Sequence, residues 1–511
     1  MQAVSHHLLL PKSLYVEVAP ARFKNTRLIF QNLEWARRLD MTNVLTTDHD
    51  WHQHFVQFTP LTGSLPTPLA LCYHGHQFGV YNPELGDGRG FLYAQVIDPK
   101  TARVLDLATK GSGQTPFSRQ GDGRLTLKGA VRELLATSML DALGVATSHT
   151  FAIAETDESL QRSDEPSPTR AAVLVRLSHS HIRLGSFQRL AYLKDNASLE
   201  ALIRHTLTYY CPTPATPAET KTIASMPIGE ASATLLNHAI SNIARLTALW
   251  MAAGFVHGVL NTDNYNITGE SFDYGPWRFL PSLTPNFTAA YFDQHGRYCY
   301  GRQPEAGLWA LSRFAECLLP FVASDRLNAQ LQTYQSKLDT ALTYAVCHRL
   351  GIAGEWDEAS AFVRDFLTAL SESASKDESN FETAFFDWYG AGHDPNRPHA
   401  SPRHKFYATP AFAKLGDRLK NAPLLPHTAH ALAHPYFAGD HPETMLIDEV
   451  EALWQPIADK DDWQPLAKKL TAIRHMKAAL CLAQTPTKTA IPAAADKHKQ
   501  TAAARLLGKD I

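Results

Sequence analysis

The chain has 511 residues, 44 % of them hydrophobic, so it is too long for one small domain and can bury extensive cores. A formal net charge of −2 argues against a protein that binds nucleic acid through overall positive charge. The six cysteines are scattered without a C-x-x-C pair, which argues against a zinc ribbon or a disulfide framework and fits a reducing compartment. We find neither a signal-peptide pattern nor an apolar run of about 20 residues. We therefore expect a cytoplasmic protein whose partners are neither nucleic acids nor membranes.

Composition and periodicity divide the chain into four expected parts. Residues 1–60 mix short apolar runs with histidines and read as an N-terminal arm. Residues 61–200 are rich in strand patterns, whereas residues 201–345 have mainly helical patterns. Residues 346–511 are expected to form a helical C-terminal extension.

A glycine-rich run at residues 86–90, GDGRG, directly precedes a predicted strand at residues 91–97. Glycines let backbone N–H groups approach a phosphate closely. The run matches neither the P-loop nor the dinucleotide fingerprint, and a tight turn explains the glycines equally well. A phosphate loop and a structural turn therefore both stay open.

A second predicted strand, at residues 103–110, ends in Lys110, and a predicted helix at residues 128–143 carries Glu133. Protein kinases pair a strand lysine with a helix glutamate in this way. The alternative is a solvated lysine at a strand end and an ordinary surface glutamate. Between the two residues, the stretch 111–124 is denser in glycine and charge than a plain turn.

Two arginines, Arg176 and Arg183, follow in and just after an apolar predicted strand at residues 171–177. A buried arginine needs an anion or a carboxylate as partner. Guanidinium groups suit bidentate binding of phosphate. Phosphate binding and a structural ion pair are both open from the residues alone.

The most informative stretch is residues 257–264, HGVLNTDN. Small-molecule kinases carry a loop of the form H-G-D-x-x-x-x-N, and here Val259, which cannot accept a proton, stands at the position of the base. Asn264 aligns with the metal-binding asparagine, Asp263 adds a carboxylate before it, and Asp273 opens a DYG sequence. Such oxygen ligands suit Mg²⁺ or Mn²⁺. An Asx-rich turn is the structural alternative.

The order of these elements, with strands, a lysine, a helix and then a loop motif, is that of a bilobal kinase. We predict an α+β protein with a kinase-like fold: a β-rich N-lobe that binds nucleotide, a helical C-lobe with the catalytic loop and metal site, and the helical extension. Fold analogy alone does not establish chemistry. The histidine pair His74 and His76 is expected to be structural, because no further metal-ligand spacing accompanies it.

Taken together, the motifs resemble the selenoprotein O (YdiU) family of pseudokinases, most firmly over residues 25–320. The stretches that carry the resemblance are YHGHQFG at 73–79, LGDGRG at 85–90, KGSGQTPFSRQGDGR at 110–124, RE at 132–133, HGVLNTDN at 257–264 and DYGP at 273–276. The resemblance implies a kinase-like fold that binds ATP in a flipped orientation. It implies AMP transfer to Ser, Thr or Tyr hydroxyls of proteins, the protein itself included, with release of pyrophosphate. The choice between ATP and UTP as donor stays open.

The resemblance also implies roles for individual residues. Asp263 matches the catalytic base, and Asn264 and Asp273 match ligands of Mg²⁺ or Mn²⁺. Glu133 matches the helix partner of the strand lysine. The positions that match nucleotide and phosphate binding are Gly86, Gly88, Arg89, Lys110, Asp122, Gly123, Arg176 and Arg183.

Two other functions remain as alternatives. One is an ordinary phosphotransferase, against which Val259 argues because the loop lacks its usual base. The other is an ATP-binding pseudokinase module without transfer activity. Against that module, the chain has Lys110, Glu133, Asn264 and Asp273 together. A binding scaffold has no need of a complete set of phosphate-binding and metal-binding residues.

Overall fold

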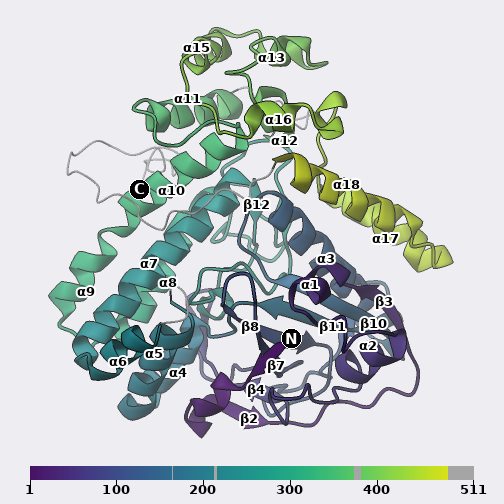
Figure 1. Ribbon diagram of the computed structural model, residues 1–511, viewed down its shortest axis with the longest axis vertical. Helices are drawn as coiled ribbons and strands as arrows, with labels where there is room; N and C mark the ends of the chain where they lie inside the picture. The colour runs from purple at the N-terminus through teal and green to yellow at the C-terminus, as the bar shows by residue number, and fades with distance from the viewer. Residues whose placement is uncertain (164, 212–215, 373–380, 481–511) are drawn as a thin grey trace.

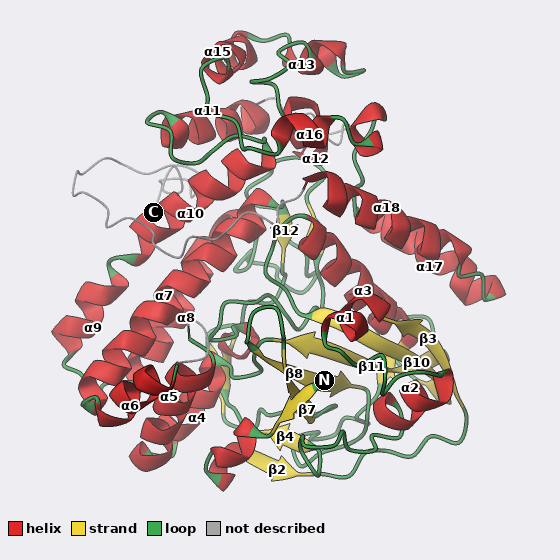
Figure 2. Ribbon diagram, in the orientation of Figure 1, coloured by secondary structure: helices red, strands yellow, loops and turns green. Residues whose placement is uncertain are grey.

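The computed structural model describes residues 1–163, 165–211, 216–372 and 381–480 (Figure 1). Strands gather in one part of the molecule and helices make up most of the remainder, which gives a mixed α+β architecture (Figure 2). Residues 481–511, the end of the expected extension, lie outside the described residues.

The strands are short, apart from two long ones that end the N-terminal third of the chain. Their bounds are β1 (Gln2–Val4), β2 (Tyr15–Glu17), β3 (Thr26–Gln31), β4 (Leu69–Leu71), β5 (Gly75–Gln77), β6 (Val80–Asn82), β7 (Leu92–Ile97), β8 (Val104–Lys110), β9 (Leu125–Thr126), β10 (His149–Leu160), β11 (Thr169–Ser178), β12 (Phe255–Val256) and β13 (Arg278–Phe279).

Helices dominate after residue 184. The α-helices are α1 (Leu33–Arg38), α2 (Asp48–Phe55), α3 (Leu127–Ala142), α4 (Leu184–Tyr192), α5 (Asn196–Tyr209), α6 (Pro217–Ser225), α7 (Ile228–Ala252), α8 (Gln303–Cys317), α9 (Ser324–Leu331), α10 (Tyr334–Arg349), α11 (Ala359–Glu372), α12 (Phe381–Trp388), α13 (Arg397–Ala400), α14 (His404–Tyr407), α15 (Pro410–Leu419), α16 (Thr428–Leu432), α17 (Ile447–Lys460) and α18 (Gln464–Leu480). None of the helices in the described ranges is long and apolar enough to cross a bilayer.

The main sheet has the strand order β2-β4-β7-β8-β11-β10-β3, with β1 paired to β7 and β9 to β11. Its strand pairs are antiparallel. The expected N-terminal arm therefore supplies three strands of this sheet. Across β8 and β11, Ala108 lies opposite Arg176 and Lys110 opposite Leu174. Because side chains alternate between the faces of a sheet, Lys110 and Arg176 point to the same face.

One face of the sheet packs against the segment that contains α1 and α2. Trp51 and Phe55 of α2 join a buried cluster with Leu107 and Val175. α2 begins with a capping box, in which Thr47 accepts a hydrogen bond from the Asp50 N–H. The segment with α1 and α2 therefore covers the face of the sheet opposite to Lys110. The face that carries Lys110 is left for α3 and the later helices.

The helix α3 packs on the lysine face. Thr126 caps its first turn by accepting a hydrogen bond from the Gly129 N–H at 3.1 Å. Leu134 joins a buried cluster with Ile153 and Leu174, side chains of the sheet. The same helix turn carries Glu133, which is thereby aimed at the end of β8.

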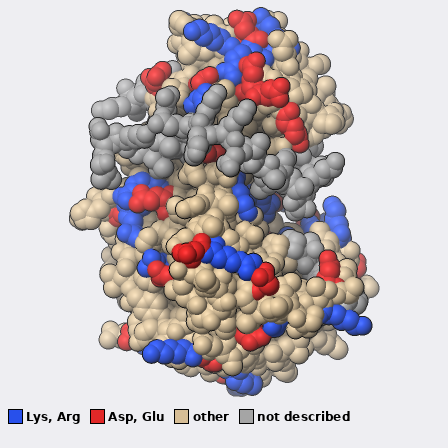
Figure 3. All heavy atoms as spheres, turned by 90° about the vertical axis from the view of Figure 1, so that its left-hand side faces the viewer, with Lys and Arg blue, Asp and Glu red and all other residues tan. Residues whose placement is uncertain are grey.

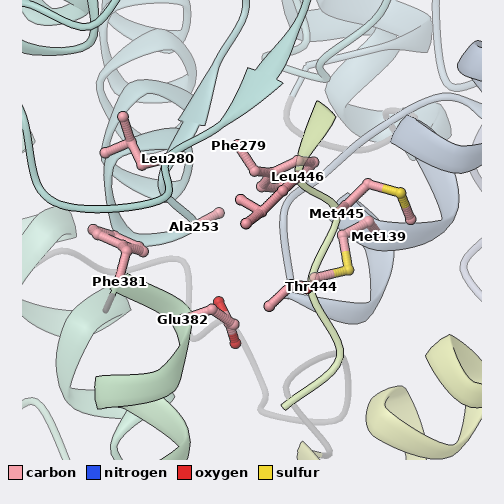
Figure 4. Close-up of a pocket in the computed structure, with 9 residues that line it drawn as sticks. All are labelled: Met139, Ala253, Phe279, Leu280, Phe381, Glu382, Thr444, Met445 and Leu446. Carbon is pink, nitrogen blue, oxygen red and sulfur yellow. The ribbon is translucent and has the colours of Figure 1, made fainter. Parts of the chain in front are cut away.

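The C-terminal helices return to the sheet and to α3 (Figure 1). Lys128 on α3 pairs with Glu451 on α17 at 2.7 Å, and Lys477 on α18 pairs with Asp141 on α3 at 2.7 Å. Near the C-terminal end of α3, which carries Met139 and Asp141, the segment 444–446 passes α12 and leaves a small pocket (Figure 4). It is lined by Met139, Ala253, Phe279, Leu280, Phe381, Glu382, Thr444, Met445 and Leu446. None of the predicted site residues lines this pocket.

The surface charges match the near-zero net charge. On the face seen in Figure 3, lysines and arginines are interspersed with aspartates and glutamates wherever side chains are coloured. That face offers no broad area of one sign.

Candidate functional site

Three cations meet at Asp273, the first residue of DYG. Lys110 Nζ lies 2.5 Å from Glu133 Oε2 and 3.1 Å from Asp273 Oδ1. Arg176 hydrogen-bonds to Oδ1 of Asp273, and Arg183 hydrogen-bonds to Oδ2. The structure therefore brings together five of the predicted site residues, from β8, α3, β11 and the loops after β11 and β12.

Asp273 is held as an ionised carboxylate. Burial raises its pKa, but the charges of Arg176, Arg183 and Lys110 outweigh burial and bring the pKa well below its usual range. The residue has a φ of 59°, in the left-handed region that side chains other than glycine seldom adopt. Strained backbone of this kind persists where the surroundings over-determine it, and it clusters at functional sites.

Arg183 is fixed by its backbone and by two aromatic rings. It forms an antiparallel bridge with Asn266, just after the loop 257–264. Its guanidinium lies over the rings of Tyr73 at 4.4 Å and Phe272 at 4.7 Å. It also donates a hydrogen bond to the backbone oxygen of Asp263 at 2.9 Å. We call Lys110, Arg176 and Arg183, which surround Asp273, the cation cluster. Arg183 thus joins this cluster to the predicted catalytic loop.

Asp263 is buried in a 3₁₀ turn formed by residues 262–264. Its Oδ1 atom has no hydrogen-bond partner within the described structure. Burial raises the pKa of this carboxyl to about 6, against the opposing charge of Arg183. Gly75 packs against it so closely that a Cβ there would lie 2.8 Å from Oδ1. A buried carboxylate oxygen without a partner is suited to accept a proton or to contact a ligand.

Asn264 is oriented by a hydrogen bond from its Nδ2 to the backbone oxygen of Val259 at 2.9 Å. Its carbonyl oxygen is therefore left for another partner. The buried His257 ties this loop to the DYG segment through a contact of 3.0 Å between Nε2 and the Phe272 backbone oxygen. In the described ranges no group of three or more His, Cys, Asp or Glu side chains could hold a metal ion. Asn264 and Asp273 carry oxygens of the kind that Mg²⁺ takes as ligands, but both oxygens of Asp273 are already bonded to Lys110, Arg176 and Arg183.

The two glycine-rich stretches pack on one another. A Cβ at Gly86 would lie 2.3 Å from the Phe117 ring, and one at Gly88 would lie 2.8 Å from the Phe117 backbone oxygen. Thr115 Oγ1 donates to the Asp87 backbone oxygen at 2.6 Å. Close packing therefore requires glycine here whether or not a phosphate binds. The Arg89 side chain is exposed and has no partner in the described residues.

Asp122 and Gly123 lie in the second stretch, away from the contacts of Asp273. Asp122 pairs with Arg162 at 2.8 Å and accepts a hydrogen bond from the Arg124 N–H at 2.9 Å. Burial raises its pKa, but the hydrogen bonds and charges of Arg162 and Arg124 together outweigh burial, so the pKa is lowered. Gly123 has a φ of 70° and lies against the Gly113 backbone. No contact in the described structure joins Asp122 to the cation cluster.

The model of the family described as protein adenylyltransferase SelO matches residues 3–474 of the chain. Relatives called protein nucleotidyltransferase YdiU occur in Synechocystis (36 % identical, covering 89 % of this chain and 94 % of the relative) and Synechococcus elongatus (38 %, covering 90 % and 92 %). A third, in Gloeobacter violaceus, is 38 % identical and covers 90 % of this chain and 92 % of its own. This chain belongs to the SelO family. It is a protein nucleotidyltransferase, and the family resemblance read from the sequence motifs is confirmed.

Three residues of this SelO-family site were not predicted. Asp87 lies 3.4 Å from Arg183 Nη2. Arg176 Nε donates to His181 Nε2 at 3.1 Å, and His181 N donates to Asp106 Oδ2 at 3.0 Å. Burial and then Arg176 bring the pKa of His181 well below its usual value, so the ring is neutral and accepts from Arg176.

These residues carry weak sequence signals. Asp87 stands inside GDGRG, where the glycines drew attention to the backbone instead of the side chain. Asp106 shares a strand face with Lys110 by simple alternation, which is the one pattern that could have indicated it. His181 has no local signal, because Asp106, the carboxylate that it contacts, lies 75 residues earlier in the sequence. His74 and His76, expected to be structural, contact Tyr81 OH at 2.8 Å and Gln188 Nε2 at 2.9 Å.

Proposed function

We propose that this protein transfers the AMP group of ATP to serine, threonine or tyrosine hydroxyls of other proteins and of itself, and that it does so in the cytoplasm. The observation that carries the proposal is the contact between Asp263 and Arg183, a member of the cation cluster. A buried carboxylate with an unpaired oxygen stands beside Arg183, which also reaches Asp273. A transfer reaction needs these two features side by side: a proton acceptor and a set of charges for phosphates.

The proposal includes a kinase-like division of the chain. Residues 61–200 act as the nucleotide-binding lobe, residues 201–345 carry the catalytic loop, and residues 346–511 form an extension. Support comes from the Lys110–Glu133 pair between β8 and α3, which has the layout that protein kinases use to set a phosphate-binding lysine. Val259 at the kinase base position and Asp263 four residues later distinguish this loop from that of a phosphotransferase.

In the proposed roles, Lys110, Arg176 and Arg183 bind the phosphates of the nucleotide. Asn264 and Asp273 would hold Mg²⁺ or Mn²⁺, which supplies further positive charge at the phosphates when it is bound. The glycine-rich stretches with Gly86, Gly88, Arg89, Asp122 and Gly123 line the nucleotide. Arg89 is free to turn toward an anion because nothing in the described structure engages it.

The reaction follows from these positions. Asp263 accepts the proton of the acceptor hydroxyl, and the resulting oxygen attacks the α-phosphorus. The bond from the α-phosphorus to the oxygen that bridges to the β-phosphorus breaks, and pyrophosphate leaves with that electron pair. Lys110 and the two arginines stabilise the charge that moves onto the phosphates. In this structure the three cations are bonded to Asp273, so they must loosen from that carboxylate when phosphates and metal bind.

The test uses purified protein with Mg²⁺ or Mn²⁺ and ATP labelled at either the α- or the γ-phosphate. We expect α-label in protein and no γ-label. Protein-bound γ-label alone would identify a phosphotransferase. ATP binding with neither label would identify a binding module. Parallel reactions with α-labelled UTP decide which nucleotide is the donor.

A further inference from the structure

A group of large apolar side chains is exposed next to the catalytic loop. Val80 and Tyr291 have 72 % and 83 % of their surface exposed, and Phe78 and Phe292 are also exposed. The Phe78 and Phe292 rings are 5.8 Å apart, and those of Tyr291 and Phe292 are 5.2 Å apart. We call these four residues the hairpin surface, because Phe78 and Val80 belong to the β5–β6 hairpin. Exposed apolar side chains in contact with one another, such as Phe78, Phe292 and Tyr291, mark an interaction site more often than scattered single residues do.

The hairpin is fixed to the catalytic loop by its backbone. His76 N donates to Thr262 Oγ1 at 2.7 Å, and Phe78 N donates to Asn261 Oδ1 at 3.0 Å. Asn261 Oδ1 also accepts from Tyr298 OH at 2.9 Å. Both loop residues immediately precede Asp263, so the hairpin surface and the proposed base form one rigid unit.

The start of the hairpin touches the base itself. Gly75 lies against the Asp263 carboxylate, and Phe78 is three residues further along the hairpin. At about 3.3 Å per residue in extended chain, Phe78 is about 10 Å from this contact. Asp263 therefore meets the cation cluster through its backbone oxygen and the hairpin through its carboxylate.

These two contacts limit what the hairpin surface can bind. The unpaired Oδ1 of Asp263 can accept a hydrogen bond from a bound partner. The hairpin surface, about 10 Å away, can bind an apolar group of the same partner. A polypeptide that offers a hydroxyl side chain and, about three residues away in extended conformation, an aromatic or large aliphatic side chain satisfies both. A nucleotide does not, because its phosphates need the cations.

We propose that the hairpin surface binds the acceptor protein and selects hydroxyl residues that have a large apolar residue about three positions away. This inference rests on the proposed function, since it names the partner of the same site. All four residues of the hairpin surface supply the contact and take no part in the chemistry, and Val80 and Tyr291 are the most exposed of them.

The test uses two short synthetic peptides that share one serine in a background of alanine and lysine. One peptide carries phenylalanine on both sides of the serine at that spacing, and the other carries alanine there. The wild-type protein is compared with the double variant Val80→Ser, Tyr291→Ser and with the control Leu319→Ser. Leu319 is an exposed apolar residue too, but it lies outside the hairpin surface. Peptide binding is followed by fluorescence anisotropy and transfer by α-label, each with saturating ATP.

We expect wild type and the control to prefer the phenylalanine peptide by about tenfold in kcat/KM, since burying one such side chain supplies that much discrimination. The double variant should lose most of this preference through a higher KM for the peptide, with an unchanged KM for ATP. Equal preference in wild type and double variant would overturn the proposal.

The remaining outcomes separate the acceptor surface from the reaction. Preferential binding without labelling supports the surface and contradicts the proposed AMP transfer. Labelling of both peptides without a preference supports the proposed AMP transfer and contradicts the proposed binding role of the hairpin surface. Loss of self-labelling in the double variant with unchanged peptide kinetics would make Tyr291 an acceptor in a second copy of the chain, and it would overturn the docking role.

Discussion

Asp263 combines burial, an unpaired oxygen and a raised pKa, whereas its neighbour Asn264 is held by the loop backbone. Aspartate and asparagine have nearly the same shape, so replacing the carboxylate by an amide removes the proton acceptor and leaves the packing against Gly75 intact. The base can thus be tested separately from the fold.

We expect Asp263→Asn to lower the rate of AMP transfer by about 10²–10⁴, the range that general-base catalysis contributes. Affinity for ATP and the thermal midpoint should stay close to wild type, because the cation cluster is untouched. Steady-state labelling, ATP titration and thermal unfolding check these points, with the exposed Asp417→Asn as control. Near-normal labelling by Asp263→Asn would remove Asp263 from the role of base.

His181 contacts the site through Arg176. It accepts the Arg176 Nε–H, and Asp106 contacts both its backbone N–H and, at 3.4 Å, its Nδ1. Without His181 the buried guanidinium would have one unsatisfied N–H, at a cost of about 1–3 kcal/mol.

We therefore expect His181→Phe to raise the KM for ATP about tenfold or more, and His181→Gln, whose amide oxygen accepts a hydrogen bond, to recover part of that loss. The KM for the acceptor should not change in either variant. A uniform loss of kcat in both variants, with lowered thermal midpoints, would show that His181 serves only the fold.

At the scale of elements, helix α3 links the site to the sheet through the Lys110–Glu133 pair. Glu133→Gln keeps the side-chain volume and removes the charge that holds Lys110 on the side of the helix. The lysine then retains Asp273 alone as its carboxylate partner, at 3.1 Å.

We expect Glu133→Gln to raise the KM for ATP about tenfold with a smaller change in kcat, because a buried charged hydrogen bond of this kind contributes about 1.5–3 kcal/mol. Comparison with Glu316→Gln, on the exposed side of α8, controls for the charge change. An unchanged KM for ATP in Glu133→Gln would mean that Lys110 does not need its helix partner.

The elements that carry the site were predictable from local patterns. The expected helix at residues 128–143 is α3, Leu127–Ala142, and the expected strand at 103–110 is β8, Val104–Lys110. Their apolar periodicity is strong, and a threonine cap and Gly144 bound the helix. Helix α7, Ile228–Ala252, lies in the part of the chain, residues 201–345, that was expected to be mainly helical.

The pairing of strands that are far apart in the chain could not be predicted from the sequence. The strands of residues 1–60 are three to six residues long and are stabilised only by partners far along the chain, such as β7 for β1 and β10 for β3. The site divides in the same way. Lys110, Glu133 and Asp273 stand in recognisable motifs. Asp87 meets Arg183, and Asp106 meets His181 beside Arg176, only when the sheet and loops assemble.

At the scale of the whole molecule, the C-terminal helices stabilise the sheet through Asp461. This residue, just after α17, accepts hydrogen bonds from Arg27 on β3 and Arg170 on β11. The hydrogen bonds from Arg27 and then Arg170 lower the pKa of Asp461. A folded-state pKa below the unfolded value near 3.9 contributes stability above that value, and the contribution is lost as the pH falls.

Asp461→Asn should therefore lower the thermal midpoint at pH 7, by an amount that corresponds to about 1 kcal/mol for this largely exposed network. The difference from wild type should shrink as the pH falls below about 4. Thermal unfolding across that range checks this, with the exposed Asp357→Asn as control. A difference that does not depend on pH would mean that the carboxylate charge is not what stabilises the contact.

The contacts that α17 and α18 make with α3 and the sheet have a consequence for biosynthesis. Arg27 meets Asp461 across 434 residues of sequence, and Lys128 meets Glu451 across 323. While the ribosome is still making the chain, the lysine, the glutamate and the catalytic loop all emerge before the helices that brace them. The growing polypeptide is thus without the contacts made by Glu451 and Asp461 until α17 and the residue after it have been made.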